Sequence, residues 1–153
     1  MSIEIERKYL VKSLEFKKVS NKQYRIKQGF LNSDKNRVVR IRIRDDKGFI
    51  TIKGKSSSDG LSRFEWEQEI SLKDAESLYA MCEPGIIDKT RFEVPWKGYL
   101  IEVDEFHQQH QGLIIAEIEL NHESEKPDLP NWIEKEVTGN PEYYNVNLSK
   151  KGL

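Results

Sequence analysis

The sequence predicts an α+β fold that is mostly β: a closed, eight-stranded antiparallel β-barrel with a charged lumen and a few covering helices. Two observations lead to this prediction. Apolar and charged residues alternate with a period of two through most of the chain, which is typical of strands with two unlike faces. The links between these segments are short, which favours antiparallel neighbours, and about eight strands suffice to close a barrel.

Eight segments carry the strand alternation. They span residues 3–11, 23–31, 37–45, 48–54, 64–70, 86–94, 99–106 and 113–120. Turn-forming residues at 45–48 and 96–98 predict hairpins between neighbouring strands. The small, polar stretch 54–62 predicts a surface loop.

Three other segments have helical character. Residues 71–81 begin at Ser71, a favourable N-cap, and place apolar side chains along one face. Residues 131–137 and 141–152 predict two short helices in the tail. We expect these helices to cover the apolar outer faces of the strands.

The composition limits the class of protein. A chain of 153 residues predicts one domain, residues 1–153. No apolar run reaches the roughly eighteen residues of a membrane-spanning helix, and the charged start does not resemble a signal peptide, so we expect a cytoplasmic protein without membrane contact. The single cysteine, Cys82, excludes an internal disulfide. A net charge of -1 argues against general nucleic-acid binding, and the sequence leaves a homodimer open.

The placement of the charges is more informative than their total. Arg40, Arg42 and Arg44 lie about 7 Å apart on one strand face, which is mildly repulsive unless an anion lies over them. Glu4 and Glu6 form a carboxylate pair that suits a divalent cation. The alternative is an ordinary solvated face, but such faces usually include neutral polar residues, which are scarce here. The charged faces therefore predict a lumen that binds a polyphosphate chain with Mg²⁺ or Mn²⁺.

The segment EIERK at residues 4–8 resembles the ExExK signature of the CYTH superfamily, also called triphosphate tunnel metalloenzymes. The resemblance continues in order along essentially the entire chain. The matching segments are QGFL at 28–31, VRIRIR at 39–44, TIK at 51–53, GLSRFEWE at 60–67, KTR at 89–91, EVDEF at 102–106, AEIEL at 116–120 and EVTGNPEYYNVNL at 136–148. This resemblance implies a tunnel of eight antiparallel strands, in agreement with the strand faces.

The resemblance also implies roles for single residues. The implied metal ligands are Glu4, Glu6, Glu102, Asp104, Glu117 and Glu119. The implied phosphate-binding residues are Lys8, Arg40, Arg42, Lys53, Arg63, Lys89 and Arg91. The implied catalytic residues are Lys8, Glu65, Glu67 and Asp104. Phe30 stands where similar relatives often have tyrosine, so a hydroxyl role beside Lys8 is absent or supplied elsewhere, with Tyr24 and Thr51 as candidates.

The function implied by the resemblance is metal-dependent hydrolysis of a triphosphate, with inorganic tripolyphosphate, cleaved to pyrophosphate and phosphate, as the leading substrate. The implied cofactor is Mg²⁺ or Mn²⁺. A class IV-type adenylate cyclase and a thiamine triphosphatase use the same residues, although small loops leave little sequence for a nucleoside pocket. A non-catalytic polyphosphate-binding module is a further alternative, but a pure anion binder gains nothing from carboxylates beside its ligand.

Overall fold

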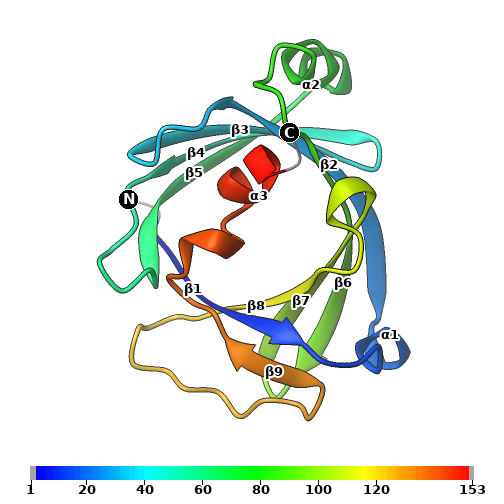
Figure 1. Cartoon of the computed structure of the whole chain (residues 1–153), viewed down its shortest axis with the longest axis vertical. Coiled ribbons are helices and arrows are strands. Elements are labelled where there is room, and N and C mark those ends of the chain that lie inside the picture. Colours follow the sequence, from blue (N-terminus) through cyan, green and yellow to red (C-terminus); the bar gives the residue numbers. More distant parts are fainter. Residues whose placement is uncertain (1–2, 152–153) are drawn as a thin grey trace.

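Eight antiparallel strands close into a barrel in the computed structural model, which describes residues 3–151 (Figure 1). The strands are β1 (Ile3–Val11), β2 (Lys22–Asn32), β3 (Arg37–Arg44), β4 (Lys47–Gly54), β5 (Ser62–Ile70), β6 (Ile87–Trp96), β7 (Tyr99–Phe106) and β8 (Ile114–Glu119). Their order is β5-β4-β3-β2-β6-β7-β8-β1, and β1 also pairs with β5. This last pairing closes the barrel, as the sequence predicts.

Strand β1 pairs with different strands along one edge at its two ends. Its first residues, Ile3 to Ile5, pair with β5, and its last residues pair with a ninth strand, β9 (Ile133–Glu136). The helix predicted for residues 131–137 is therefore wrong. Once β1 leaves β5, its backbone groups on that edge need new partners, and β9 supplies them. This long-range requirement overrides the local helical spacing of the segment.

Charged side chains point into the barrel and apolar side chains point outward, in agreement with the predicted faces. On β3, for example, Arg40 and Arg42 line an internal cavity, whereas Ile41 between them is buried on the other face. The larger apolar core thus lies outside the barrel wall. It contains Tyr9, Phe16, Phe92, Val94, Ile101, Val103, Ala116, Ile118, Leu120, Trp132 and Ile133.

Two short helices lie on the outside of the barrel. Helix α1 (Phe16–Val19), which the sequence analysis did not predict, buries Phe16 against Phe92 and Trp132. Helix α2 (Leu72–Tyr79) confirms the prediction for 71–81, including the cap, and contacts β2, β3 and β4. Among residues 3–151, no helix is long and apolar enough to cross a membrane.

The C-terminal segment lies within the ring of strands rather than on its outer face (Figure 1). It consists of a 3-10 turn, Pro141–Tyr143, and helix α3 (Asn145–Lys151). Leu148 packs with Ile87, Phe106 and Ile115, whose side chains form an apolar layer across one end of the interior. The helix predicted for residues 141–152 is confirmed over Asn145–Lys151, with residue 152 outside the described part of the chain, but its expected position as an outer cover is wrong. Its apolar side chains complete a layer inside the barrel.

Candidate functional site

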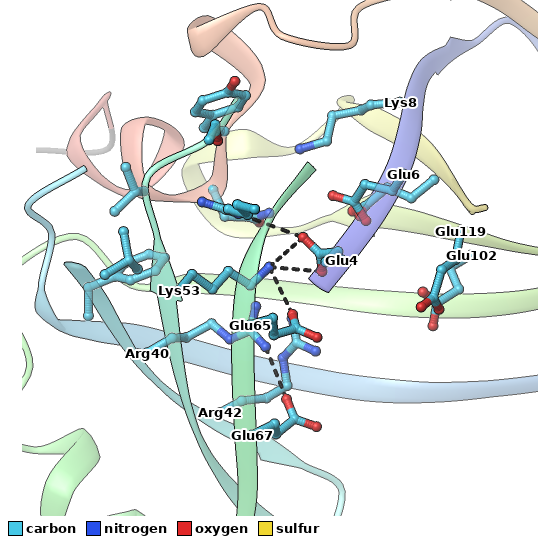
Figure 2. Close-up of a pocket in the computed structure, with 18 of the residues that line it drawn as sticks. Glu4, Glu6, Lys8, Arg40, Arg42, Lys53, Glu65, Glu67, Glu102 and Glu119 are labelled. Atoms are coloured by element: carbon cyan, nitrogen blue, oxygen red, sulfur yellow. Dashed lines mark hydrogen bonds and ion pairs between the residues drawn. The ribbon is translucent and has the colours of Figure 1, made fainter. Parts of the chain in front are cut away.

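The barrel encloses a cavity of about 360 Å³, lined mainly by charged side chains (Figure 2). Thirteen of the fifteen residues implied by the sequence line it: Glu4, Glu6, Lys8, Arg40, Arg42, Lys53, Arg63, Glu65, Glu67, Arg91, Glu102, Glu117 and Glu119. Lys89 and Asp104 do not line the cavity. The period-two alternation therefore brings together residues from seven strands, although they are far apart in the sequence.

One wall of the cavity is acidic, because three adjacent strands present carboxylates to it. In the pairing of β1 with β8, Glu6 lies opposite Glu119 and Lys8 lies opposite Glu117. In the pairing of β7 with β8, Glu102 lies opposite Glu117. Glu4 continues the row along β1 toward the basic wall. The register thus places like charges side by side, which destabilises the fold unless protons or cations neutralise them.

The carboxyl groups of Glu6 and Glu117 respond to this crowding in opposite ways. Burial and the negative charges of Glu117 and Glu4 raise the pKa of Glu6 well above its usual range. At Glu117, burial opposes ionisation, but the positive charges of Lys8 and Arg91 outweigh it and lower the pKa. The pair therefore holds a proton to higher pH than an isolated carboxyl group would, and a divalent cation can take the place of that proton.

The facing wall is basic, and ion pairs connect it to Glu4. Lys53 Nζ lies 3.2 Å from both carboxylate oxygens of Glu4 and 3.3 Å from Glu65 Oε2. Arg63 Nε lies 3.6 Å from Glu4 Oε1. Burial alone would raise the pKa of Glu4, but Lys53, a hydrogen bond with Glu65, and Arg63 together lower it to about 2. Glu4 is therefore ionised at neutral pH.

Two arginines of β3, the buried Arg40 and the half-buried Arg42, point toward the cavity. Arg40 Nη2 donates to Thr51 Oγ1 at 3.1 Å and lies 3.4 Å from Glu67 Oε2, but within residues 3–151 its Nε has no hydrogen-bond partner. Arg42 Nε donates to Gln28 Oε1 at 2.8 Å. Burial and the positive charges of Arg40 and Arg91 lower the pKa of Arg42 to about 9. An anion in the cavity could accept hydrogen bonds from both guanidinium groups.

Arg91 lines the cavity, and its guanidinium group is bound by Asp104, which does not line the cavity. Arg91 Nε and Nη2 donate to the two oxygens of Asp104 at 2.7 and 2.9 Å. Arg91 also lies 3.3 Å from Glu102 and 3.7 Å from Glu117. Asp104 in turn pairs with Lys89 at 2.8 Å. These contacts join the basic residues of β6 to the acidic wall.

The contacts of Lys8 bear on the replacement of the family tyrosine by Phe30. Lys8 Nζ donates to the Tyr143 carbonyl oxygen at 3.3 Å and lies 5.5 Å from the centroid of the Tyr144 ring. The hydroxyl of Thr51 is instead bound to Glu67 and Arg40, and that of Tyr24 is bound to Glu93. The aromatic side chain beside Lys8 therefore comes from the C-terminal segment.

Arg44 lines the cavity, as its place on the charged face with Arg40 and Arg42 predicts, although the resemblance assigned it no role. The sequence analysis missed three lining residues of the C-terminal segment. Tyr144, Asn145 and Val146 also line the cavity. No local pattern indicated these three, because their position depends on the entry of α3 into the barrel.

The acidic wall has the donor chemistry of a divalent metal site. Among residues 3–151, no three histidine, cysteine or acidic side chains converge as a ready-made metal cage. Mg²⁺ is usually bound by one or two carboxylates, with water and substrate phosphates completing its shell, so a wall of paired carboxylates beside an anion site fits such an ion. The raised pKa of Glu6 supports this fit, because burial and the charges of Glu117 and Glu4 outweigh the positive charge of Lys53 at that group.

Comparisons with known proteins agree with this geometry. The CYTH domain matches residues 2–151. An inorganic triphosphatase of Acetivibrio thermocellus is 43% identical over 151 residues, covering 98% of this chain and 95% of that protein. An inorganic triphosphatase of Nitrosomonas europaea is 32% identical over 151 residues, covering 95% of this chain and 96% of that protein.

Solved structures show the same architecture. The inorganic triphosphatase NE1496 is 28% identical, with a TM-score of 0.65, and the match covers 95% of this chain and 97% of that one. A Hippeastrum protein described as having a dominant triphosphatase activity matches with a TM-score of 0.60 over 80% of each chain, but at 15% identity it shows the fold alone.

Proposed function

The chain belongs to the CYTH domain family, and on this premise we propose that it is a metal-dependent triphosphatase that hydrolyses inorganic tripolyphosphate to pyrophosphate and phosphate. One observation carries the proposal: an acidic wall and a basic wall face each other across a cavity of about 360 Å³ inside the barrel. The inorganic triphosphatases that are 43% and 32% identical support it.

We assign the metal to the acidic wall. Glu4, Glu6 and Glu117 would hold Mg²⁺ or Mn²⁺, with Glu119 and Glu102 beside them. A bound divalent ion withdraws charge from phosphate oxygens and lowers the pKa of bound water. Hard oxygen ligands suit both ions.

The basic residues would bind and orient the triphosphate. Arg40, Arg42 and Arg91 offer guanidinium donors, and Lys8, Lys53 and Arg63 add positive charge around the same cavity. Phosphoryl transfer is accelerated mainly by positioning and by neutralising the oxygens, which these groups do without covalent chemistry.

We propose that Glu65 and Glu67 orient the attacking water. Both carboxylates lie on the basic wall, where Lys53 and Arg40 hold them. Burial and the adjacent Glu4 raise the pKa of Glu65, which makes it a stronger base. The Lys8 ammonium would stabilise the leaving phosphate oxygen.

The size of the cavity favours an inorganic substrate over a nucleotide. Pockets for drug-sized ligands occupy roughly 300–1,000 Å³, and this cavity lies near the lower limit. The C-terminal segment fills one end of the barrel, where an attached nucleoside would need space.

The proposal is tested by a substrate panel. The purified protein is given tripolyphosphate, ATP or thiamine triphosphate with Mg²⁺ or Mn²⁺, and phosphate, pyrophosphate and cyclic AMP are measured. We expect the highest kcat/KM for tripolyphosphate, with equal amounts of phosphate and pyrophosphate. Cyclic AMP as the main product from ATP, or tight metal-independent binding of tripolyphosphate without hydrolysis, would overturn the proposal.

A further inference from the structure

Lys89 and Asp104 form a buried ion pair inside the barrel that lies beside the cavity but does not line it. Their side chains are 0% and 1% exposed, and the Lys89 Nζ to Asp104 Oδ2 distance is 2.8 Å. Arg91, in contrast, lines the cavity. The three side chains share one face of adjacent strands, because Lys89 and Arg91 are two residues apart on β6 and Asp104 lies opposite Arg91 on β7. The pair is therefore one layer removed from the space that a substrate would occupy.

The contacts of Asp104 leave it unsuited to bind a metal. Arg91 binds both of its oxygens with a forked pair of hydrogen bonds, and Lys89 shares Oδ2. Three of the roughly four acceptor positions of the carboxylate are thus occupied by cationic donors. A divalent cation bound to either oxygen would lie next to two positive charges in a buried environment, where their repulsion is strong.

The contacts of Lys89 likewise leave it unsuited to bind a phosphate. Besides Asp104, its ammonium donates to Asn145 Oδ1 at 3.2 Å and lies 5.4 Å from the centroid of the Phe106 ring. Asn145 begins α3, and Leu148 of the same helix packs on Ile87. The ammonium group is therefore enclosed by β7 and the C-terminal segment.

We propose that Asp104 and Lys89 are positioning residues that fix the Arg91 guanidinium group at the cavity wall and connect it to Asn145 of the C-terminal segment. The fork from Asp104 leaves Arg91 one orientation. Lys89 balances the charge of the carboxylate, since an unpaired charge is costly when buried. Seating α3 thus helps to order a residue of the active site. This inference rests on the proposed function only in assigning Arg91 to phosphate binding.

The first test is the variant Asp104→Asn, assayed with tripolyphosphate at a series of metal concentrations. Losing a charge-assisted hydrogen bond to Arg91 should raise KM about ten- to hundredfold, with a smaller change in kcat. The metal concentration for half-maximal activity should stay unchanged. In an Arg91→Gln background, Asp104→Asn should raise KM by less than a further factor of about three, because both substitutions remove the same Asp104–Arg91 interaction. A shifted metal requirement or fully additive losses would overturn the inference.

A matched control uses the outer face of the barrel. Asp88 binds Arg25 with the same forked geometry, at 2.6 and 2.8 Å, but outside the cavity. Asp88→Asn should leave KM and kcat within about twofold of the wild type, because this partly exposed pair lies on the outer face and neither of its side chains lines the cavity. A loss equal to that of Asp104→Asn would contradict a specific role for Asp104.

A second measurement uses the wild-type protein and remains decisive if Asp104→Asn does not fold. Lysine amines are methylated with formaldehyde and a reducing agent, with and without tripolyphosphate, and the modified residues are identified by mass spectrometry. Lys89 should stay unmodified in both conditions, whereas Lys35 and Lys55, exposed at the cavity, should react. Modification of Lys89 that tripolyphosphate prevents would make it a phosphate-binding residue. This readout requires no turnover, so it is independent of the proposed activity.

Discussion

At the scale of single residues, the cations of the cavity differ in how firmly they are held. Arg91 is fixed by a carboxylate fork, whereas Arg42 has the amide of Gln28 as its partner. Arg44 is held by two aromatic rings, with centroids 5.1 Å away in Tyr24 and 4.9 Å away in Phe49. Such contacts orient a guanidinium group without neutralising it, so Arg44 retains its full positive charge toward the cavity.

This arrangement predicts that Arg44 contributes to substrate capture more than to chemistry. In Arg44→Gln we expect KM for tripolyphosphate to rise about three- to tenfold with kcat nearly unchanged, and the difference to shrink at high salt. Steady-state kinetics at two ionic strengths measure both effects. Arg37→Gln is the control, because Arg37 lies on the same strand with its side chain 70% exposed and paired with Asp34. An equal effect of both variants would contradict the prediction.

The ionisation of Asp104 predicts that the free energy of unfolding falls at acid pH. Burial would raise its pKa, but Arg91 and Lys89 outweigh burial and lower it to about 2. Because the pKa of Asp104 is lower in the folded state than in the unfolded state, its ionisation stabilises the fold at pH values above the unfolded-state pKa of about 3.9. This stabilisation disappears as the pH falls toward 2. The free energy of unfolding should lose about 2 kcal/mol over this window, and Asp104→Asn should lack that component.

Urea unfolding at pH 5 and pH 3 measures this term. The stability difference between the wild type and Asp104→Asn should narrow as the pH falls. Asp128→Asn, whose side chain is 83% exposed, serves as the control and should parallel the wild type. A difference that is constant across the window would contradict the assigned ionisation.

At the scale of elements, the apolar core depends on short segments outside the barrel. Phe16 is fully buried although α1 is four residues long. Its ring contacts Phe92 of β6 and Trp132, which precedes β9, so α1 fastens the two segments together. On the opposite side, a Cβ at Gly48 would lie 2.3 Å from the Cβ of Ala75, so this glycine permits α2 to approach β4 closely.

The role of α1 predicts a large loss of stability in Phe16→Ala. Removing a buried phenylalanine side chain typically costs about 3–5 kcal/mol, through lost burial and the cavity left behind. Leu14→Ala provides the control, because Leu14 is 54% exposed and should change stability by about 0.5 kcal/mol or less. Chemical denaturation of both variants measures the difference. Similar losses in the two variants would contradict the proposed packing.

The sequence predicted the strands and most of the lumen because side-chain alternation is a local property. The period-two alternation predicted Arg91, Lys89 and Asp104 on the inner face of the barrel. It does not indicate where along the barrel axis each side chain lies. That position is decided by α3, which closes one end of the interior. Elements of four residues, α1 and β9, are too short for periodicity to identify, and each is stabilised by partners distant in the sequence.

At the scale of the whole molecule, the barrel wall separates two environments. Apolar faces form the core outside it, and charged faces enclose the cavity inside it. The net charge of -1 counts every charged residue of the chain and does not reveal that cationic and anionic side chains gather around the cavity. Burying so many charges is costly unless a ligand and its metal complete their pairing, so the interior of the barrel is organised for an anion that carries a cation.

The central claim is that this interior is where metal-bound tripolyphosphate is hydrolysed. The most direct test compares kcat/KM for tripolyphosphate, with Mg²⁺ or Mn²⁺, in the wild type and in Glu6→Ala and Arg42→Ala, one from each wall. Arg25→Ala, on the outer face, is the control, and circular dichroism verifies folding. We expect each interior variant to lose about a hundredfold or more, as is typical when a group that stabilises transition-state charge is removed. Full activity in both interior variants would contradict the claim.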